Sequence, residues 1–200
     1  LAEMGFLGLL VPEDLGGAGL GNLALSLVLE ELNRACPSTG VTVSVQNSLV
    51  AGPILRFGTD AQRKRFLPRL ASGETVGAYA LTEPGHGSDA GALETTAVQK
   101  GDKYVLNGRK AWITSGDRAG LVIVFATTDR SLGSKGITAF LVEKPTKGLS
   151  TGKHEKKLGI RGSETVELVL DDVEVPQENV LGEVGKGFKQ IGKETAKAFK

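Results

Sequence analysis

Residues 82–89 hold the densest set of chemically capable groups in the chain. The segment reads TEPGHGSD and follows the apolar run 76–81. Free backbone N–H groups in a glycine-rich turn can form an anion nest, to which a serine hydroxyl adds a donor. The segment is no Walker loop, because the Gly-Lys-[Ser/Thr] ending is missing, and no dinucleotide fingerprint opens a helix here. The spacing leaves two interpretations open, a phosphate-binding loop and an ordinary loop with an Asx turn at Asp89.

A second candidate, Trp112 to Gly116, contains the only tryptophan of the chain. On a regular strand Trp112 and Thr114 share a face, because the side-chain period is two. A flat indole beside a hydroxyl can hold a planar heteroaromatic ring by stacking and one hydrogen bond. Tryptophan more often fills a core, so core packing is the alternative.

The other polar groups carry weaker signals. We expect His86 to be a loop residue and Cys36 to be a small buried hydrophobe. The charged run 153–157 (KHEKK) is typical of a solvated turn, with contact to a phosphate group as the alternative.

Composition excludes several classes of protein. Of 200 residues, 40% are hydrophobic and 24% charged, which favours a globular chain over a disordered one. The net charge of +1 lacks the basic excess of a nucleic-acid binder. Apolar runs fall far short of the roughly 20 residues of a membrane span. With one cysteine and two histidines, we expect no intrachain disulfide and no zinc site. No signal-peptide pattern is visible, so we expect a protein that is not secreted.

The order of the predicted elements indicates an α+β chain. The first helix is expected at Asn22–Ala35, capped by Asn22 and closed by Pro37 and Gly40, with Leu23, Leu27 and Val28 on one side. A second is expected at 41–57, with a bend or break at Pro53. A third is expected at 61–70, capped by Asp60, with Phe66, Leu67 and Leu70 facing inward.

Strands follow from residue 76 onward. They are expected at 76–81, 121–127, 137–143 and 166–175. A hairpin is expected between a strand at 103–106 and a second strand that ends at Thr114, with Asn107-Gly108 as its turn. The fold class is therefore an N-terminal all-helical domain (1–77) followed by a mainly antiparallel β-barrel or sandwich (78–182). Residues 183–200 read as the start of another helix.

Two motifs together resemble the flavin signatures of the acyl-CoA dehydrogenase family. They are YALTEPGHGSD (79–89) and NGRKAWITSG (107–116), and their order and separation are also similar to the family's. The resemblance extends over residues 1–189, through VPEDLGGAG (11–19), DDVEVP (171–176) and NVLG (179–182). Residues 135–142 and 157–163 resemble the short-chain, butyryl-CoA branch most.

The resemblance implies FAD as cofactor. It places Leu81 and Thr82 at the flavin pyrimidine, Gly87 and Ser88 at the pyrophosphate, Trp112 over the isoalloxazine and Thr114 near flavin N5. It also places Ser88 near the acyl-CoA. The full set of cofactor-binding residues that it implies is Tyr79, Leu81, Thr82, Gly87, Ser88, Trp112, Ile113 and Thr114. The family's catalytic glutamate lies in a C-terminal four-helix bundle, which these 200 residues do not contain, so no catalytic residue is assigned.

The implied reaction is the α,β-dehydrogenation of a short-chain acyl-CoA to the trans-2-enoyl-CoA. The resemblance further implies an electron-transferring flavoprotein as acceptor, a homotetramer, and a location in the cytoplasm of a bacterium or the mitochondrial matrix of a eukaryote. Three alternatives stay open: an acyl-CoA oxidase, a non-catalytic flavin-binding or assembly fragment, and a helical-plus-β interaction module without flavin. We expect these 200 residues alone to be inactive.

Overall fold

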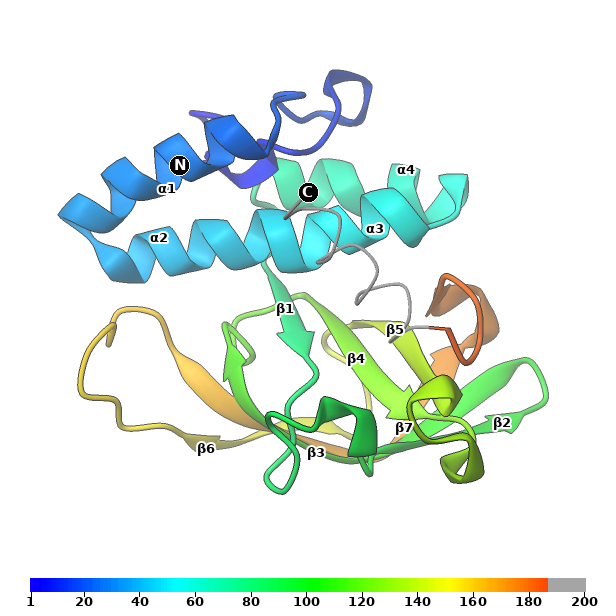
Figure 1. The fold of residues 1–200 in the computed structure, drawn as a ribbon. Helices are drawn as coiled ribbons and strands as arrows, with labels where there is room; N and C mark the ends of the chain where they lie inside the picture. The colour runs from blue at the N-terminus through cyan, green and yellow to red at the C-terminus, as the bar shows by residue number, and fades with distance from the viewer. Residues whose placement is uncertain (187–200) are drawn as a thin grey trace.

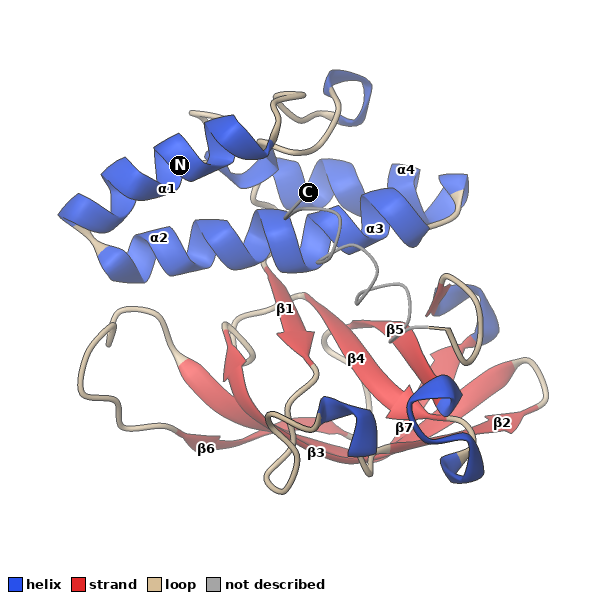
Figure 2. Ribbon diagram, in the orientation of Figure 1, coloured by secondary structure: helices blue, strands red, loops and turns tan. Residues whose placement is uncertain are grey.

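A layer of helices covers one face of a curved sheet (Figures 1 and 2). The computed structural model describes residues 1–186, so most of the helix expected at 183–200 lies outside the described residues. The helical layer consists of α1 (Asn22–Ala35), α2 (Pro37–Ser44), η3 (Val45–Ala51), α3 (Gly52–Phe57) and α4 (Asp60–Ala71), preceded by two short 3-10 turns, η1 (Phe6–Gly8) and η2 (Glu13–Leu15).

The bounds of α1 agree with the sequence, but its cap and its inward face do not. Gly21 is the N-cap and provides no side-chain hydrogen bond, and Asn22 is the first helical residue. Leu23 and Leu27 are exposed, whereas Leu25 is buried. The apolar positions of α1 therefore extend around the helix beyond the stripe that faces the rest of the molecule.

The turn after α1 begins a new helix directly. Pro37 is the first residue of α2 rather than a stop, because a proline at this position loses no helical hydrogen bond. Gly40 lies inside α2, where an added Cβ would come within 2.4 Å of the Asn33 side chain on α1. Cys36 is exposed between the two helices, so the prediction of a buried cysteine is wrong.

Pro53 neither breaks nor ends the second apolar helix. Instead η3 is a π-helical segment, in which the Gly52 N–H donates to the Asn47 carbonyl, five residues back. A widened turn of this kind accommodates residues around a proline that cannot donate a helical hydrogen bond.

The start of α4 is capped by Thr59 and not by Asp60. The Thr59 hydroxyl accepts from the Gln62 N–H at 3.2 Å, and the Gln62 side chain accepts from the Thr59 N–H at 3.0 Å. This reciprocal capping box fixes the first turn. The predicted inward residues of α4 are confirmed as buried: Phe66, Leu67 and Leu70.

Within residues 1–186 the sheet contains eight strands and is mainly antiparallel. They are β1 (Gly77–Ala80), β2 (Thr96–Lys100), β3 (Lys103–Thr114), β4 (Leu121–Thr127), β5 (Ile137–Glu143), β6 (Leu149–His154), β7 (Thr165–Pro176) and β8 (Val180–Leu181). Their order is β6-β7-β3-β2-β4-β5-β8, and β1 pairs with β4. The pairs β1/β4 and β2/β4 are parallel, and the others are antiparallel. Three further 3-10 segments are η4 (Ala90–Ala92), η5 (Arg130–Gly136) and η6 (Gln177–Asn179).

The expected hairpin turn at Asn107-Gly108 is wrong, because β3 runs straight through it. The Asn107 side chain donates to the Asp172 carboxylate at 2.9 Å and accepts from the Asp172 N–H at 2.9 Å, at a bulge in β7. Gly108 passes so close to the residue before β2 that an added Cβ would lie 2.5 Å from the Thr95 hydroxyl. The turn between β2 and β3 lies instead at Gly101, whose φ is +65°.

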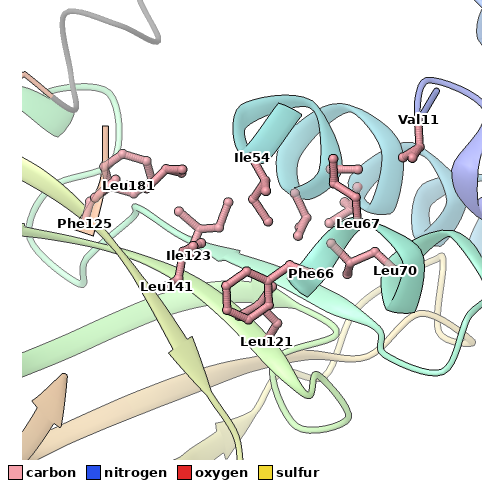
Figure 3. Packing of buried hydrophobic residues seen from close by; sticks show 14 of the residues in the cluster. Val11, Ile54, Phe66, Leu67, Leu70, Leu121, Ile123, Phe125, Leu141 and Leu181 are labelled. Atoms are coloured by element: carbon pink, nitrogen blue, oxygen red, sulfur yellow. The ribbon is translucent and has the colours of Figure 1, made fainter. Parts of the chain in front are cut away.

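Strand β4 is buried on both faces and separates two hydrophobic clusters. Leu121, Ile123 and Phe125 pack toward the helices (Figure 3), and the alternating residues Val122, Val124 and Ala126 belong to the second cluster.

The strand β1 enters the sheet from the helical layer, and Gln46 fixes this junction. Its side chain donates to the Leu70 and Thr75 carbonyls and accepts from the Gly77 N–H at 2.8 Å.

Candidate flavin-binding site

The fold brings the two sequence motifs side by side. The chain leaves β1 at Leu81, and the Thr82 carbonyl accepts a hydrogen bond from the Ala111 N–H of β3 at 2.9 Å. Lys110, the preceding residue of β3, reaches the Leu81 carbonyl with its ammonium at 3.1 Å. The loop after β1 is therefore attached to the middle of β3, directly beside Trp112.

A bulge in β3 exposes Trp112. Lys110 pairs with Leu168 of β7 and Ile113 pairs with Val166, so β3 has one extra residue between these pairs. Trp112 takes a positive φ of 61° at this point and is 60% exposed, whereas Lys110 and Ile113 on either side are buried. The extra residue thus keeps both flanking side chains inside. The alternative in which Trp112 fills the core is wrong.

The loop beyond Thr82 is open and polar. Gly87 and Ser88 are exposed, and apart from Gly87 and its chain neighbours no atom of residues 1–186 lies within 4 Å of the position that a Cβ of Gly87 would take. The hydroxyls of Thr82, Ser88 and Thr114 make no hydrogen bond within residues 1–186. They can donate to a ligand without breaking a contact inside this part of the chain.

Beneath this surface lies a buried ion pair, which sequence reasoning missed. The Lys110 ammonium is 2.8 Å from the Glu83 carboxylate, and their side chains are 0% and 5% exposed. The same carboxylate accepts from the Glu94 N–H at 2.6 Å, from the Thr95 N–H at 2.9 Å and from the Thr95 hydroxyl. Hydrogen bonds to an ionised group are the stronger ones, so these contacts hold the Glu83 carboxylate in place.

Burial and pairing shift the pKa values of both partners. Burial lowers the pKa of Lys110 to about 8, against the opposing attraction of Glu83. Burial by itself raises the pKa of Glu83, but the charge of Lys110 and the hydrogen bonds from Lys110, Thr95 and the Glu94 N–H outweigh it. The pKa of Glu83 therefore lies below its ordinary value of 4.5, and both groups are charged at neutral pH.

The lowered pKa of Glu83 gives a pH signature. A folded-state pKa below 4.5 means that ionised Glu83 stabilises the fold above that pH, and the contribution is lost as the pH falls. Because Glu83→Gln leaves the buried Lys110 ammonium without its partner, we expect it to lower the free energy of unfolding by about 3–5 kcal/mol near pH 6 and by clearly less near pH 3.5. Urea unfolding of both proteins at the two pH values measures this difference. A difference that stays constant would show that Glu83 is not ionised in the folded pair.

The remaining predicted site residues are partly or fully covered. Tyr79 packs against Phe125, with ring centroids 5.0 Å apart, and burial raises the pKa of its phenol. Leu81 is partly buried against the same cluster. The Ile113 side chain is 1% exposed, which leaves only its backbone for a ligand. His86 lies 3.7 Å from the Glu94 carboxylate, within the loop, as expected.

A surface depression lies at the start of β7, next to the loop that follows β6. It is lined by residues 154–157 and 163–165 together with Arg161. Thr165 of this group pairs with Thr114 across β3 and β7. The charged run 153–157 comprises the last two residues of β6 and the start of the loop after it, and its residues 154–157 line the same depression as Thr165.

Two further expectations concern membranes and metals. Among the helices of residues 1–186, none has the length and apolar character needed to cross a membrane. The same residues contain no group of three or more histidine, cysteine, aspartate or glutamate side chains that could hold a metal ion.

Family models match most of the chain. The N-terminal domain of acyl-CoA dehydrogenase matches residues 1–74, and the middle domain of acyl-CoA dehydrogenase matches residues 78–173. The mouse (Mus musculus) mitochondrial short-chain specific acyl-CoA dehydrogenase is 55% identical over 189 residues, which is 94% of this chain and 46% of that protein. The chain thus spans about half the length of the curated relatives it matches.

Solved structures agree with the sequence relatives. The structure of the electron transferring flavoprotein of Acidaminococcus fermentans, which concerns flavin-based electron bifurcation, contains a similar chain. It has a TM-score of 0.94 and 50% identity, over 97% of this chain and 51% of that one. An acyl-CoA dehydrogenase from Bacillus anthracis, complexed with FAD, has a TM-score of 0.86 and 45% identity, over 93% of this chain and 31% of that one. Sequence and structure together show that this chain belongs to the acyl-CoA dehydrogenase family, of which it contains the N-terminal and middle domains.

Proposed function

We propose that this chain forms one wall of the FAD site in a dehydrogenase of short-chain acyl-CoA thioesters. The observation that carries the proposal is the hydrogen bond between the Ala111 N–H and the Thr82 carbonyl, which sets the exposed Trp112 beside the open loop. An exposed aromatic face can stack on a flat ring, and free hydroxyl groups beside it can donate hydrogen bonds to the polar atoms at the edge of that ring. The FAD-bound relative from B. anthracis supports this cofactor.

The residues present fit FAD in both of its parts. In the proposed arrangement the Trp112 indole covers the isoalloxazine, while Thr82 and Thr114 donate to its polar atoms. Gly87 and Ser88, on the open loop, reach the pyrophosphate, for which free N–H groups and a hydroxyl are suitable donors. Tyr79, Leu81 and Ile113 support the wall from behind or through their backbone.

The reaction proposed is α,β-dehydrogenation to the trans-2-enoyl-CoA. FAD, when bound, accepts the two electrons and the hydrogen that leave the β carbon. The contribution of this chain is to hold the flavin at a fixed place and to lie along the acyl-CoA near Ser88, so that positioning lowers the barrier. The α proton needs a base, and Glu83 is unsuited because its carboxylate is buried against Lys110. The base would come from outside residues 1–186, as the family resemblance implies.

The proposal includes the partners of the complete protein. An electron-transferring flavoprotein is the proposed acceptor, which the A. fermentans structure supports. The proposed assembly is a homotetramer. The location would be the mitochondrial matrix, as for the mouse relative, or the cytoplasm of a bacterium.

Substitution of Ser88 tests the pyrophosphate contact. We expect Ser88→Ala to weaken FAD binding by about 1.5–3 kcal/mol, the range for a hydrogen bond to a charged group. Binding of riboflavin, which has no phosphates, should change far less. Titration of both ligands into both proteins measures the two losses. Equal losses would place Ser88 away from the pyrophosphate.

A further inference from the structure

One carboxylate closes the base of the loop that carries Ser88. Residues 84–93 leave from Glu83 and return to Glu94, and the Glu83 carboxylate accepts from the Glu94 N–H and the Thr95 N–H. Both ends of the loop are thus held by one side chain. Near the loop start, the Glu83 N–H and the His86 carbonyl form a further turn hydrogen bond of 3.1 Å.

Lys110 attaches this closed loop to the strand that carries Trp112. Its ammonium lies 2.8 Å from the Glu83 carboxylate and 3.1 Å from the Leu81 carbonyl, and it is fully buried. Lys110 and Trp112 are two residues apart on β3, and Trp112 lies in the bulge between Lys110 and Ile113. The buried ion pair therefore connects the two halves of the candidate site, in addition to the hydrogen bond from the Ala111 N–H to the Thr82 carbonyl.

We propose that Glu83 and Lys110 are positioning residues, which hold the loop 84–93 against β3 and thereby set the affinity for the phosphate part of FAD. This inference rests on the proposed function. A buried ion pair is weak evidence for stability, because apolar residues of similar volume often stabilise a protein as well or better. Fastening both ends of this loop removes part of the conformational freedom that Ser88 would otherwise lose when it binds a ligand. The pair is thus suited to preorganise the loop.

The test compares Glu83→Gln with Glu174→Gln. Glu174 pairs with Lys103 on the same strand β3, at 2.6 Å, but that pair is exposed. A glutamine at position 83 sets its own amide donor against the Glu94 N–H, so the base of the loop should open. We expect the amide hydrogen-exchange rates of residues 85–95 to rise about tenfold or more, because a charge-assisted hydrogen bond is lost. The exchange rates of β4 should not change. Glu174→Gln should leave both regions unchanged.

Flavin binding separates positioning from a merely structural role. Under conditions where circular dichroism shows all variants folded, Glu83→Gln should weaken FAD about tenfold or more and riboflavin much less, because only the phosphate end meets the loop. Thr95→Val keeps the ion pair and removes one donor, so its exchange rates and FAD affinity should lie between those of the wild type and Glu83→Gln. This milder variant also serves if Glu83→Gln fails to fold.

The outcomes distinguish the role of Glu83 and Lys110 in holding the loop from the proposed function. Amide exchange at residues 85–95 that is unchanged in the variants would show that Glu83 does not hold the loop 84–93 against β3, whatever the protein does with flavin. Faster exchange with equal losses for FAD and riboflavin would overturn its role in holding the phosphate end. Failure of the wild type itself to bind FAD would overturn the proposed function, and with it the flavin part of this inference. The exchange rates would still decide whether Glu83 and Lys110 hold the loop.

Discussion

Replacing Lys110 with methionine is expected to lower the free energy of unfolding by about 3–5 kcal/mol, the usual cost of leaving one partner of a buried ion pair alone. The Glu83 carboxylate would keep its hydrogen bonds from Thr95 and the Glu94 N–H but would lose the only cation in contact with it among the described residues. Urea unfolding near pH 7, followed by circular dichroism, measures the loss.

A second lysine on the same strand provides the control. Lys103 pairs with Glu174 at the surface, where the two side chains are 39% and 60% exposed. Exposed pairs typically contribute about 0–1 kcal/mol, so Lys103→Met should change the free energy of unfolding by no more than that. Similar losses in the two variants would contradict the distinction between the buried and the exposed pair.

The second large effect concerns catalysis. We expect the 200-residue chain loaded with FAD to oxidise butyryl-CoA at least about 10²-fold more slowly than a complete acyl-CoA dehydrogenase, because general-base catalysis typically contributes about 10²–10⁴-fold. Glu83 cannot remove the α proton while it is buried against Lys110, and Asp89 lies exposed on the loop. Anaerobic mixing with butyryl-CoA, monitored by the absorbance of oxidised flavin, measures the rate.

A chemical reductant controls this experiment. Dithionite should bleach the bound flavin at once, which shows that the cofactor is competent for reduction. Rapid bleaching by butyryl-CoA alone would contradict the expectation and would require a base within these residues. Bleaching only after addition of a separately prepared C-terminal bundle would support the proposed division of the site.

Those elements that depend on local apolar pattern could be predicted from the sequence. The strands β4 and β5 have the bounds that their unbroken apolar runs predict, because strands buried on both faces need no alternation. Alternation in β7 correctly placed Val166, Leu168 and Leu170 inside. The helix α1 also has its expected bounds.

The errors arise where distant segments override local preference. The dipeptide Asn107-Gly108 favours a turn, but Asp172 of β7 binds the asparagine and holds the chain extended. The prediction that Trp112 and Thr114 share a face assumed a regular strand, but β3 has a bulge at Trp112.

The buried ion pair left no signal in the sequence. Glu83 and Lys110 are 27 residues apart and both look like ordinary surface residues. Their burial follows from the tertiary arrangement, in which the loop after β1 meets the middle of β3. The candidate site residues were found through the family motifs, while the contacts that support them required the structure.

The central claim is that the exposed Trp112 and the open loop beside it bind FAD. As the only tryptophan of the chain, Trp112 reports directly on the site through its fluorescence. Titration of FAD into the folded protein should quench this emission strongly and saturably, and removal of the ring should cost about 1–3 kcal/mol of binding. Emission that does not change on saturation with FAD, in a protein shown to be folded, would contradict the placement of the flavin.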